Sequence, residues 1–83
     1  MGYHRKQINK GVFGEASKIF EEVQEFEDAL DQNAKIMELC ELSDLIGAIE
    51  AYSKNKYGIS LDDLILMKNL TKSAFEDGRR TSS

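Results

Sequence analysis

The chain has 83 residues, one cysteine and a formal net charge of −4. A single cysteine excludes an intrachain disulfide, and the lack of a Cys/His cluster excludes a structural zinc site. No apolar run approaches the roughly 20 residues that cross a bilayer, and the N-terminus lacks an apolar signal segment, so we expect a cytoplasmic protein that binds no membrane.

The small size favours self-association. A chain of this length buries only about 60–65% of its unfolded surface, so a monomer would be marginally stable. Because neither a disulfide nor zinc is available, oligomerisation is the remaining simple route to a larger core. We therefore expect a single domain over residues 1–83 that forms a homodimer or a homotetramer.

The charge is unevenly distributed along the chain. The first ten residues carry +3, residues 15–50 carry eleven acids against two lysines, and residues 51–83 carry +2. A nucleic-acid binder needs positive charge over its binding face, so no stable nucleic-acid complex is expected. An acidic middle between basic ends suits cations together with a small phosphorylated ligand.

Residues 1–10 form a polar, basic arm without periodicity, and its His4 is interpreted as an ordinary exposed residue. The first helix is predicted from Val12 to Gln32, because apolar residues recur at alternating spacings of three and four. Asn33 either closes this helix or caps the next one. The apolar seam, expected in the core, contains Ala16, Ile19, Val23, Phe26 and Leu30, widened by Phe13 and Phe20.

The second helix is predicted from Ala34 to Tyr52 or a little beyond. Cys40 within it is interpreted as a core residue, since buried cysteine behaves as a small hydrophobe. Residues 53–60 have the composition of a loop. The apolar face of this helix contains Leu39, Leu42, Leu45, Ile46, Ile49 and Tyr52.

A third helix should begin at Ser60, which has the spacing of a capping box with Asp63. It is expected to continue to about Glu76 and to end at a Gly78 cap, followed by a flexible tail at residues 79–83. Three helices with short connections predict an all-α fold, in which a three-helix protomer forms a helical bundle completed by dimerisation or tetramerisation.

Two acidic pairs carry the candidate chemistry. Glu22 and Glu25 share one side of the first helix, and Glu41 and Asp44 repeat the three-residue spacing on the second. In an antiparallel hairpin these four carboxylates would meet, and a divalent cation would remove their repulsion. All-oxygen ligands suit Mg²⁺, with Mn²⁺ as the second choice. The alternative is a pair of solvated helix faces, on which such glutamate pairs are common.

The ordered pattern resembles the MazG-like nucleotide pyrophosphohydrolases of the all-α NTP pyrophosphatase group. It reads EEVQE at residues 21–25, ELSD at residues 41–44 and KNLTKSAFEDGRR at residues 68–80, and the similarity covers roughly residues 11–80. The resemblance implies a magnesium enzyme that cleaves nucleoside triphosphates between the α and β phosphates, giving the monophosphate and pyrophosphate. It also implies dimers or tetramers.

Roles follow for individual residues. The resemblance implies that the metal ligands are Glu22, Glu25, Glu41 and Asp44. One carboxylate would accept a proton from the attacking water or orient that water, and the candidates are Glu21, Glu22 and Glu25. Candidate contacts to the substrate phosphates are Lys18, Lys68, Lys72 and Arg79, and Asn69 is a candidate hydrogen-bond partner of the substrate.

Other readings stay open. Lys68, Lys72 and Arg79 form a basic stripe along the predicted third helix. Such a stripe would also suit an ordinary solvated face. The whole chain would also suit a non-enzymatic helical protein-interaction module, or a degenerate relative that binds nucleotide without turnover.

Overall fold

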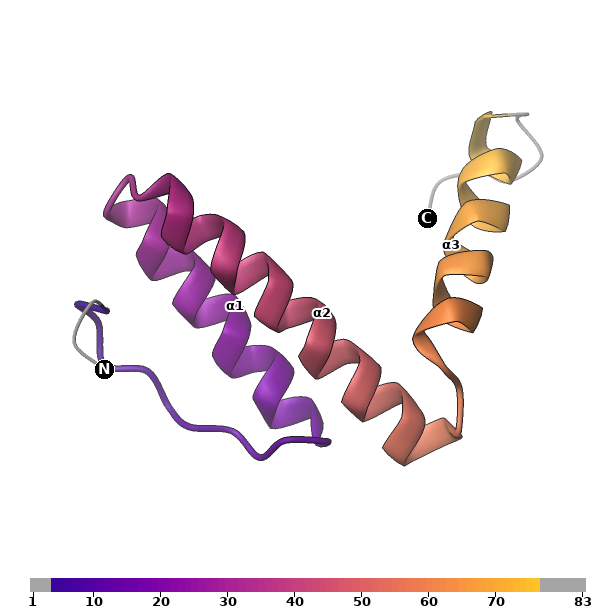
Figure 1. Cartoon of the computed structure of the whole chain (residues 1–83), viewed down its shortest axis with the longest axis horizontal. Helices are drawn as coiled ribbons and strands as arrows, with labels where there is room; N and C mark the ends of the chain where they lie inside the picture. The colour runs from indigo at the N-terminus through magenta and orange to yellow at the C-terminus, as the bar shows by residue number, and fades with distance from the viewer. Residues whose placement is uncertain (1–3, 77–83) are drawn as a thin grey trace.

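The structure is a computed structural model that describes residues 4–76, with side chains described as far as Lys72. It contains three helices, α1 (Ala16–Asp31), α2 (Lys35–Tyr57) and α3 (Leu61–Glu76), and no strand among the described residues. Helices α1 and α2 lie side by side as an antiparallel hairpin, and α3 extends away from it (Figure 1). The predicted all-α fold is confirmed.

Helix α1 begins four residues later than predicted. Gly14 has a φ of 91°, which is incompatible with a right-handed helix, and the backbone N–H of Glu15 donates to the carbonyl of Val12 at 2.9 Å. The residues before Ala16 therefore form a turn that leads into the helix.

Helix α1 ends where the sequence predicted. Asn33 has a φ of 55°, and its N–H donates to the carbonyl of Leu30 at 2.9 Å, while the N–H of Ala34 donates to the carbonyl of Ala29 at 3.2 Å. These two bonds form a Schellman motif, with asparagine in the left-handed position that glycine usually takes. Asn33 thus closes the first helix, which was one of its two predicted roles.

Helix α2 continues through residues that were predicted to form a loop. It ends only at Gly58, whose φ of 70° turns the chain and whose N–H donates to the carbonyl of Lys54 at 3.0 Å. Lys54 and Lys56 lie in the last turn, where cations interact favourably with the helix dipole. The connection to α3 is therefore only residues 58–60.

The start of α3 is confirmed. The Ser60 hydroxyl accepts the N–H of Asp63 at 3.1 Å, as expected of an N-terminal cap. The predicted Gly78 cap and the tail at residues 79–83 lie outside the described residues. No helix among the described residues combines the length and the apolar character that spanning a membrane requires.

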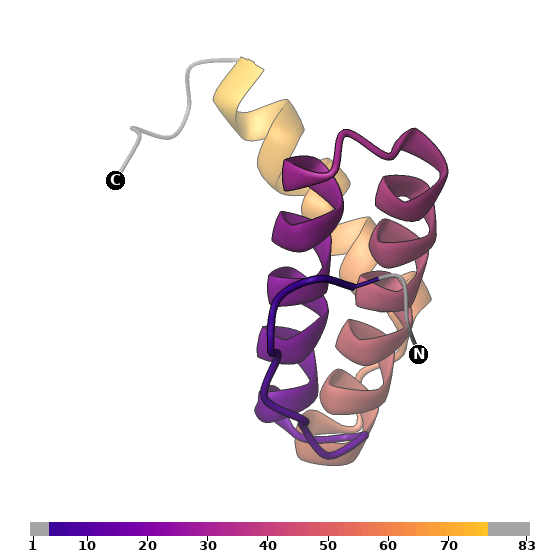
Figure 2. The same cartoon turned by 90° about the vertical axis from the view of Figure 1, so that its left-hand side faces the viewer.

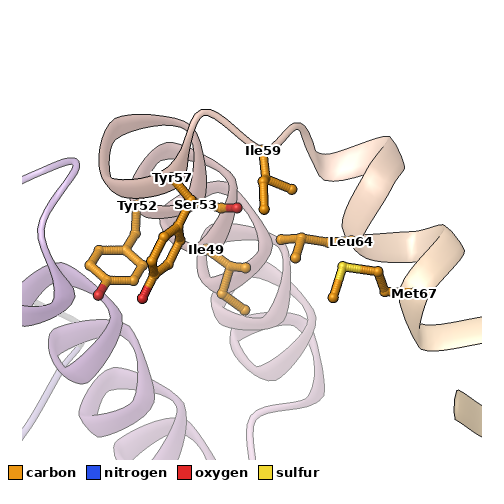
Figure 3. A pocket seen from close by; sticks show the side chains of 7 residues that line it. All are labelled: Ile49, Tyr52, Ser53, Tyr57, Ile59, Leu64 and Met67. Carbon is orange, nitrogen blue, oxygen red and sulfur yellow. The ribbon is translucent and has the colours of Figure 1, made fainter.

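Helix α3 packs against the C-terminal part of α2 around an apolar pocket of about 380 Å³ (Figure 3). Tyr52 and Tyr57 meet edge to face there, with ring centroids 6.0 Å apart. None of the described residues that line the pocket is charged. It is lined by Ile49, Tyr52, Ser53, Tyr57, Ile59, Leu64 and Met67.

The distribution of burial differs from the prediction. In the described part of the chain the buried hydrophobic residues are only Ala29 and Ala48, whereas the buried polar ones are Glu21, Glu22, Asp28, Glu41 and Ser53. Glu21, Glu22, Glu25 and Asp28 form an acidic row along α1. Helix α1 therefore turns this acidic row, and not its apolar seam, toward α2.

About half of the residues of the predicted apolar faces are correspondingly exposed in the single chain, and the others are half-buried. Val23 and Leu30 of the α1 seam are 40% and 48% exposed, and Phe20 is 65% exposed. Cys40 is also exposed, so its predicted place in the core is wrong for the protomer. The reason is geometric, because a single hairpin buries only one face of each helix.

Candidate metal centre

The α1–α2 hairpin brings carboxylates from both helices together. Oxygen atoms of Glu22, Glu41 and Asp44 lie within 4.8 Å of one another, and so do oxygen atoms of Glu21, Glu22 and Glu25. All four predicted metal ligands thus belong to two overlapping groups that share Glu22. We call the five residues of these groups the carboxylate cluster.

Three members of the cluster are buried: Glu41 is 0% exposed, Glu21 3% and Glu22 4%. Within the described residues, the Oε1 atoms of Glu22 and Glu41 have no hydrogen-bond partner. Burying an ionised carboxylate oxygen without a partner is unfavourable by several kcal/mol unless the charge is neutralised or paired. The cluster therefore has the buried, unsatisfied oxygens that a cation requires.

Glu25 lies between the other carboxylates. Burial, followed by the hydrogen bond with Glu22 and the negative charge of Glu22, raises the pKa of Glu25 to about 8, and Glu41 and Glu21 add to this effect. Glu25 therefore holds a proton at neutral pH. When no cation lies between them, neighbouring carboxylates repel one another, and protonation of one carboxyl relieves this repulsion.

Glu21 is better compensated than its neighbours. Its Oε1 accepts the backbone N–H of Gly11 at 2.8 Å and the Nζ of Lys18 at 3.1 Å. Burial by itself would raise the pKa of Glu21, but these two hydrogen bonds and the charge of Lys18 outweigh it and lower the pKa. Glu21 is therefore an ionised, oriented carboxylate at the edge of the cluster.

Lys18, which was predicted to contact a substrate phosphate, lies beside the cluster. Its Nζ lies 3.1 Å from Glu21 and 3.2 Å from Glu22. Burial would lower the pKa of Lys18, and its hydrogen bonds to the two glutamates outweigh that effect and raise it. The ammonium group stays charged next to the acids.

A pocket of about 360 Å³ opens beside the cluster, between α1 and α2. Glu22, Asp44 and Lys18 reach its wall, so it offers both acidic and basic groups to a ligand. Phe13 adds an aromatic ring that is 72% exposed. The pocket is lined by Phe13, Lys18, Glu22, Ser43, Asp44, Gly47 and Ala48.

The other predicted substrate contacts that the structure describes are not near the cluster. Lys68, Asn69 and Lys72 are exposed residues of α3. Helix α3 contacts α2 but not α1 among the described residues, and it points away from the hairpin (Figure 1). Arg79 lies outside the described residues.

Sequence reasoning missed two residues at this site. His4 was interpreted as an exposed arm residue, but its side chain is only 13% exposed. Its Nδ1 lies 2.8 Å from Asp28, and its Nε2 lies 3.1 Å from Glu41. Asp28 follows Glu25 by three residues, so its spacing already extended the acidic row of α1. No local pattern marked His4, because its partners are distant in the sequence: Asp28 lies 24 positions and Glu41 lies 37 positions further along the chain.

Comparison with known proteins finds no relative of this chain. No protein-family model matches the chain, and no curated protein or solved structure is significantly similar to it.

Proposed function

We propose that the protein hydrolyses nucleoside triphosphates between the α and β phosphates in a magnesium-dependent reaction, releasing the monophosphate and pyrophosphate. The observation that carries the proposal is the carboxylate cluster, in which Glu22 and Glu41 each keep a buried oxygen without a partner. The order of these acids along the chain, which resembles that of MazG-like enzymes, supports the same reaction.

The residues present fit a hard divalent ion. Glu22, Glu25, Glu41 and Asp44 offer only oxygen ligands, which suit Mg²⁺, with Mn²⁺ as the second choice. When bound, such an ion neutralises phosphate charge and lowers the pKa of a coordinated water. Glu22 and Asp44 also line the pocket beside the cluster, so substrate would approach the ion from there.

The remaining groups at the cluster have roles in binding substrate and in proton transfer. Lys18 reaches the pocket wall and would contact a substrate phosphate there. Glu21, Glu22 and Glu25 are the carboxylates from which one accepts the proton of the attacking water. Phe13 offers an exposed ring on which a nucleobase can stack.

We further propose that the functional unit is a homodimer or a homotetramer in the cytoplasm. The outer faces of α1 and α2 expose Phe20, Leu42 and Ile46, which are 65%, 41% and 52% accessible in the protomer. Covering such apolar surface is favourable by about 25 cal/mol for each Å² removed from water. A second copy also explains α3, because its Lys68, Asn69 and Lys72 would then act at the site of a neighbouring subunit.

The reaction is tested by a screen of NTPs and dNTPs with Mg²⁺ or Mn²⁺. We expect monophosphate and pyrophosphate in equal amounts, and we expect Glu41→Gln and Asp44→Asn each to lose about 100-fold or more in rate. Glu50→Gln is the matched control, because Glu50 is an exposed acid on the same helix. Release of single orthophosphates would contradict the proposed reaction.

Two other outcomes would point to the alternatives. Thermal stabilisation by nucleotide without pyrophosphate release would indicate a nucleotide-binding protein that has no turnover. Indifference to both metal and nucleotide would indicate a helical interaction module. Light scattering during size-exclusion chromatography tests the oligomer, and a monomer at micromolar concentration would contradict that part of the proposal.

A further inference from the structure

The N-terminal arm places an imidazole at the carboxylate cluster. The arm crosses the α1–α2 hairpin in Figure 2, and His4 bridges the two helices through Asp28 on α1 and Glu41 on α2. His4 is the only histidine of the chain. Its Nδ1 contacts Asp28 and its Nε2 contacts Glu41, so the two helices together set the orientation of the ring.

Asp28 holds the imidazole in a defined orientation. It is 1% exposed, and one of its oxygens accepts the N–H of Arg5 at 3.0 Å and the Nε2 amide of Gln32 at 2.9 Å. The N–H of Lys6 donates to its other oxygen at 3.3 Å. Burial would raise the pKa of Asp28. The hydrogen bonds from His4, Arg5, Gln32 and Lys6 outweigh burial and lower this pKa, so the carboxylate is ionised.

This arrangement has the chemistry of a metal-binding histidine. A histidine that binds a metal through one ring nitrogen generally donates the other ring N–H to a carboxylate, which fixes the tautomer and the ring plane. Here Nδ1 faces Asp28 at 2.8 Å, which leaves Nε2 directed at Glu41. Asp28 itself has four hydrogen-bond partners, which are His4, Arg5, Lys6 and Gln32, so its charge is compensated without a metal.

We infer that His4, Glu25 and Glu41 form a mixed nitrogen and oxygen site for a divalent transition-metal ion. One ligand atom from each of the three lies within 4.8 Å of the others, and the buried Oε1 of Glu41 has no hydrogen-bond partner among residues 4–72. The 3.1 Å between His4 Nε2 and Glu41 Oε2 is close to the distance of about 3 Å that separates neighbouring ligands around an ion with bonds of about 2.1 Å.

The imidazole decides which ion this site prefers. Magnesium favours oxygen ligands, whereas imidazole suits Fe²⁺, Ni²⁺, Cu²⁺ and Zn²⁺, and affinity rises from Mn²⁺ through Fe²⁺ and Co²⁺ to Cu²⁺. The site shares Glu25 and Glu41 with the proposed magnesium ligands and adds the arm to them. It goes beyond the proposed reaction, because it concerns the binding of the metal alone and requires no nucleotide.

The full-length protein in the metal-free state is titrated with Co²⁺ and, separately, with Mg²⁺ by calorimetry. We expect His4→Gln to weaken Co²⁺ binding by about 10–100-fold and to leave Mg²⁺ binding within about 3-fold of the parent. Gln7→Ala is the matched control, because Gln7 is an exposed residue of the same arm. Equal Co²⁺ affinity in the parent and in His4→Gln would overturn the inference.

A second measurement uses the unmodified chain, so it does not depend on the folding of a variant. Zinc is added while nitrogen NMR follows the single imidazole. We expect the Nε2 resonance to move on binding and Nδ1 to remain protonated next to Asp28, and an unchanged Nε2 resonance would overturn the inference. The Asp44→Asn variant separates the two proposals, because it should lose hydrolysis while the imidazole still responds to zinc.

Discussion

Glu25 should make the metal-free protein less stable as the pH rises. The pKa of this carboxyl is about 8 in the folded chain against an ordinary value of 4.5. Below pH 4.5 both the folded and the unfolded states hold the proton. Between these two values only the folded state holds it, so unfolding releases a proton and the free energy of unfolding falls as the pH increases. Above pH 8 the loss is complete.

The size of the effect follows from the width of this range. One proton changes the free energy of unfolding by about 1.4 kcal/mol for each pH unit, which sets an upper limit of about 3 kcal/mol between pH 4.5 and pH 7. Glu25 is half-buried, so solvent screens part of the repulsion and about 1–2 kcal/mol is expected. For a domain of this size, 1 kcal/mol corresponds to a Tm change of about 4–8 °C.

Urea denaturation with a chelator present, at pH values from 5 to 8 and at one protein concentration, measures this dependence. Glu25→Gln should remove most of the pH dependence and should be more stable than the parent at pH 8. Glu27→Gln is the matched control, because Glu27 is exposed on the same helix and should keep the slope of the parent. A parent chain with constant stability over this range, or a Glu25→Gln variant with the full slope, would refute the reasoning.

Three further outcomes are expected. A concentration of Mg²⁺ 100 times its Kd should raise the free energy of unfolding by about 2.7 kcal/mol in a thermal or urea melt, and Asp44→Asn should abolish the increase; an equal increase in that variant would place the ion elsewhere. Gly58→Ala should destabilise the chain by about 1 kcal/mol, because φ is 70° and no atom lies within 4 Å of the added Cβ, so only backbone strain acts; unchanged urea denaturation would argue against this helix end. Gly11→Ala should release the arm, because the added Cβ would clash with the backbone carbonyl of Ser17; limited proteolysis should then cut residues 4–11 faster than in the parent, and an equal rate would contradict a docked arm.

Local chemistry made much of the fold predictable. The three-and-four spacing of apolar residues indicated helices, Ser60 marked the start of α3, and Asn33 marked the end of α1. The first turn of α1 was misplaced because the positive φ of Gly14 interrupts an otherwise helical pattern. The second helix was predicted too short because Lys54 and Lys56 have a loop-like composition but favourable positions at a helix C-terminus.

The spacing of acids three residues apart placed Glu22 with Glu25 and Glu41 with Asp44 on their helix faces, since side-chain direction along a helix is a local property. Only the tertiary structure decided that these faces, and not the apolar seams, turn toward each other in the protomer, because the preference depends on the packing of two helices around Ala29 and Ala48. It also decided the place of His4. That contact joins the arm to both helices, and no short-range pattern records a hydrogen bond between residues so far apart in the chain.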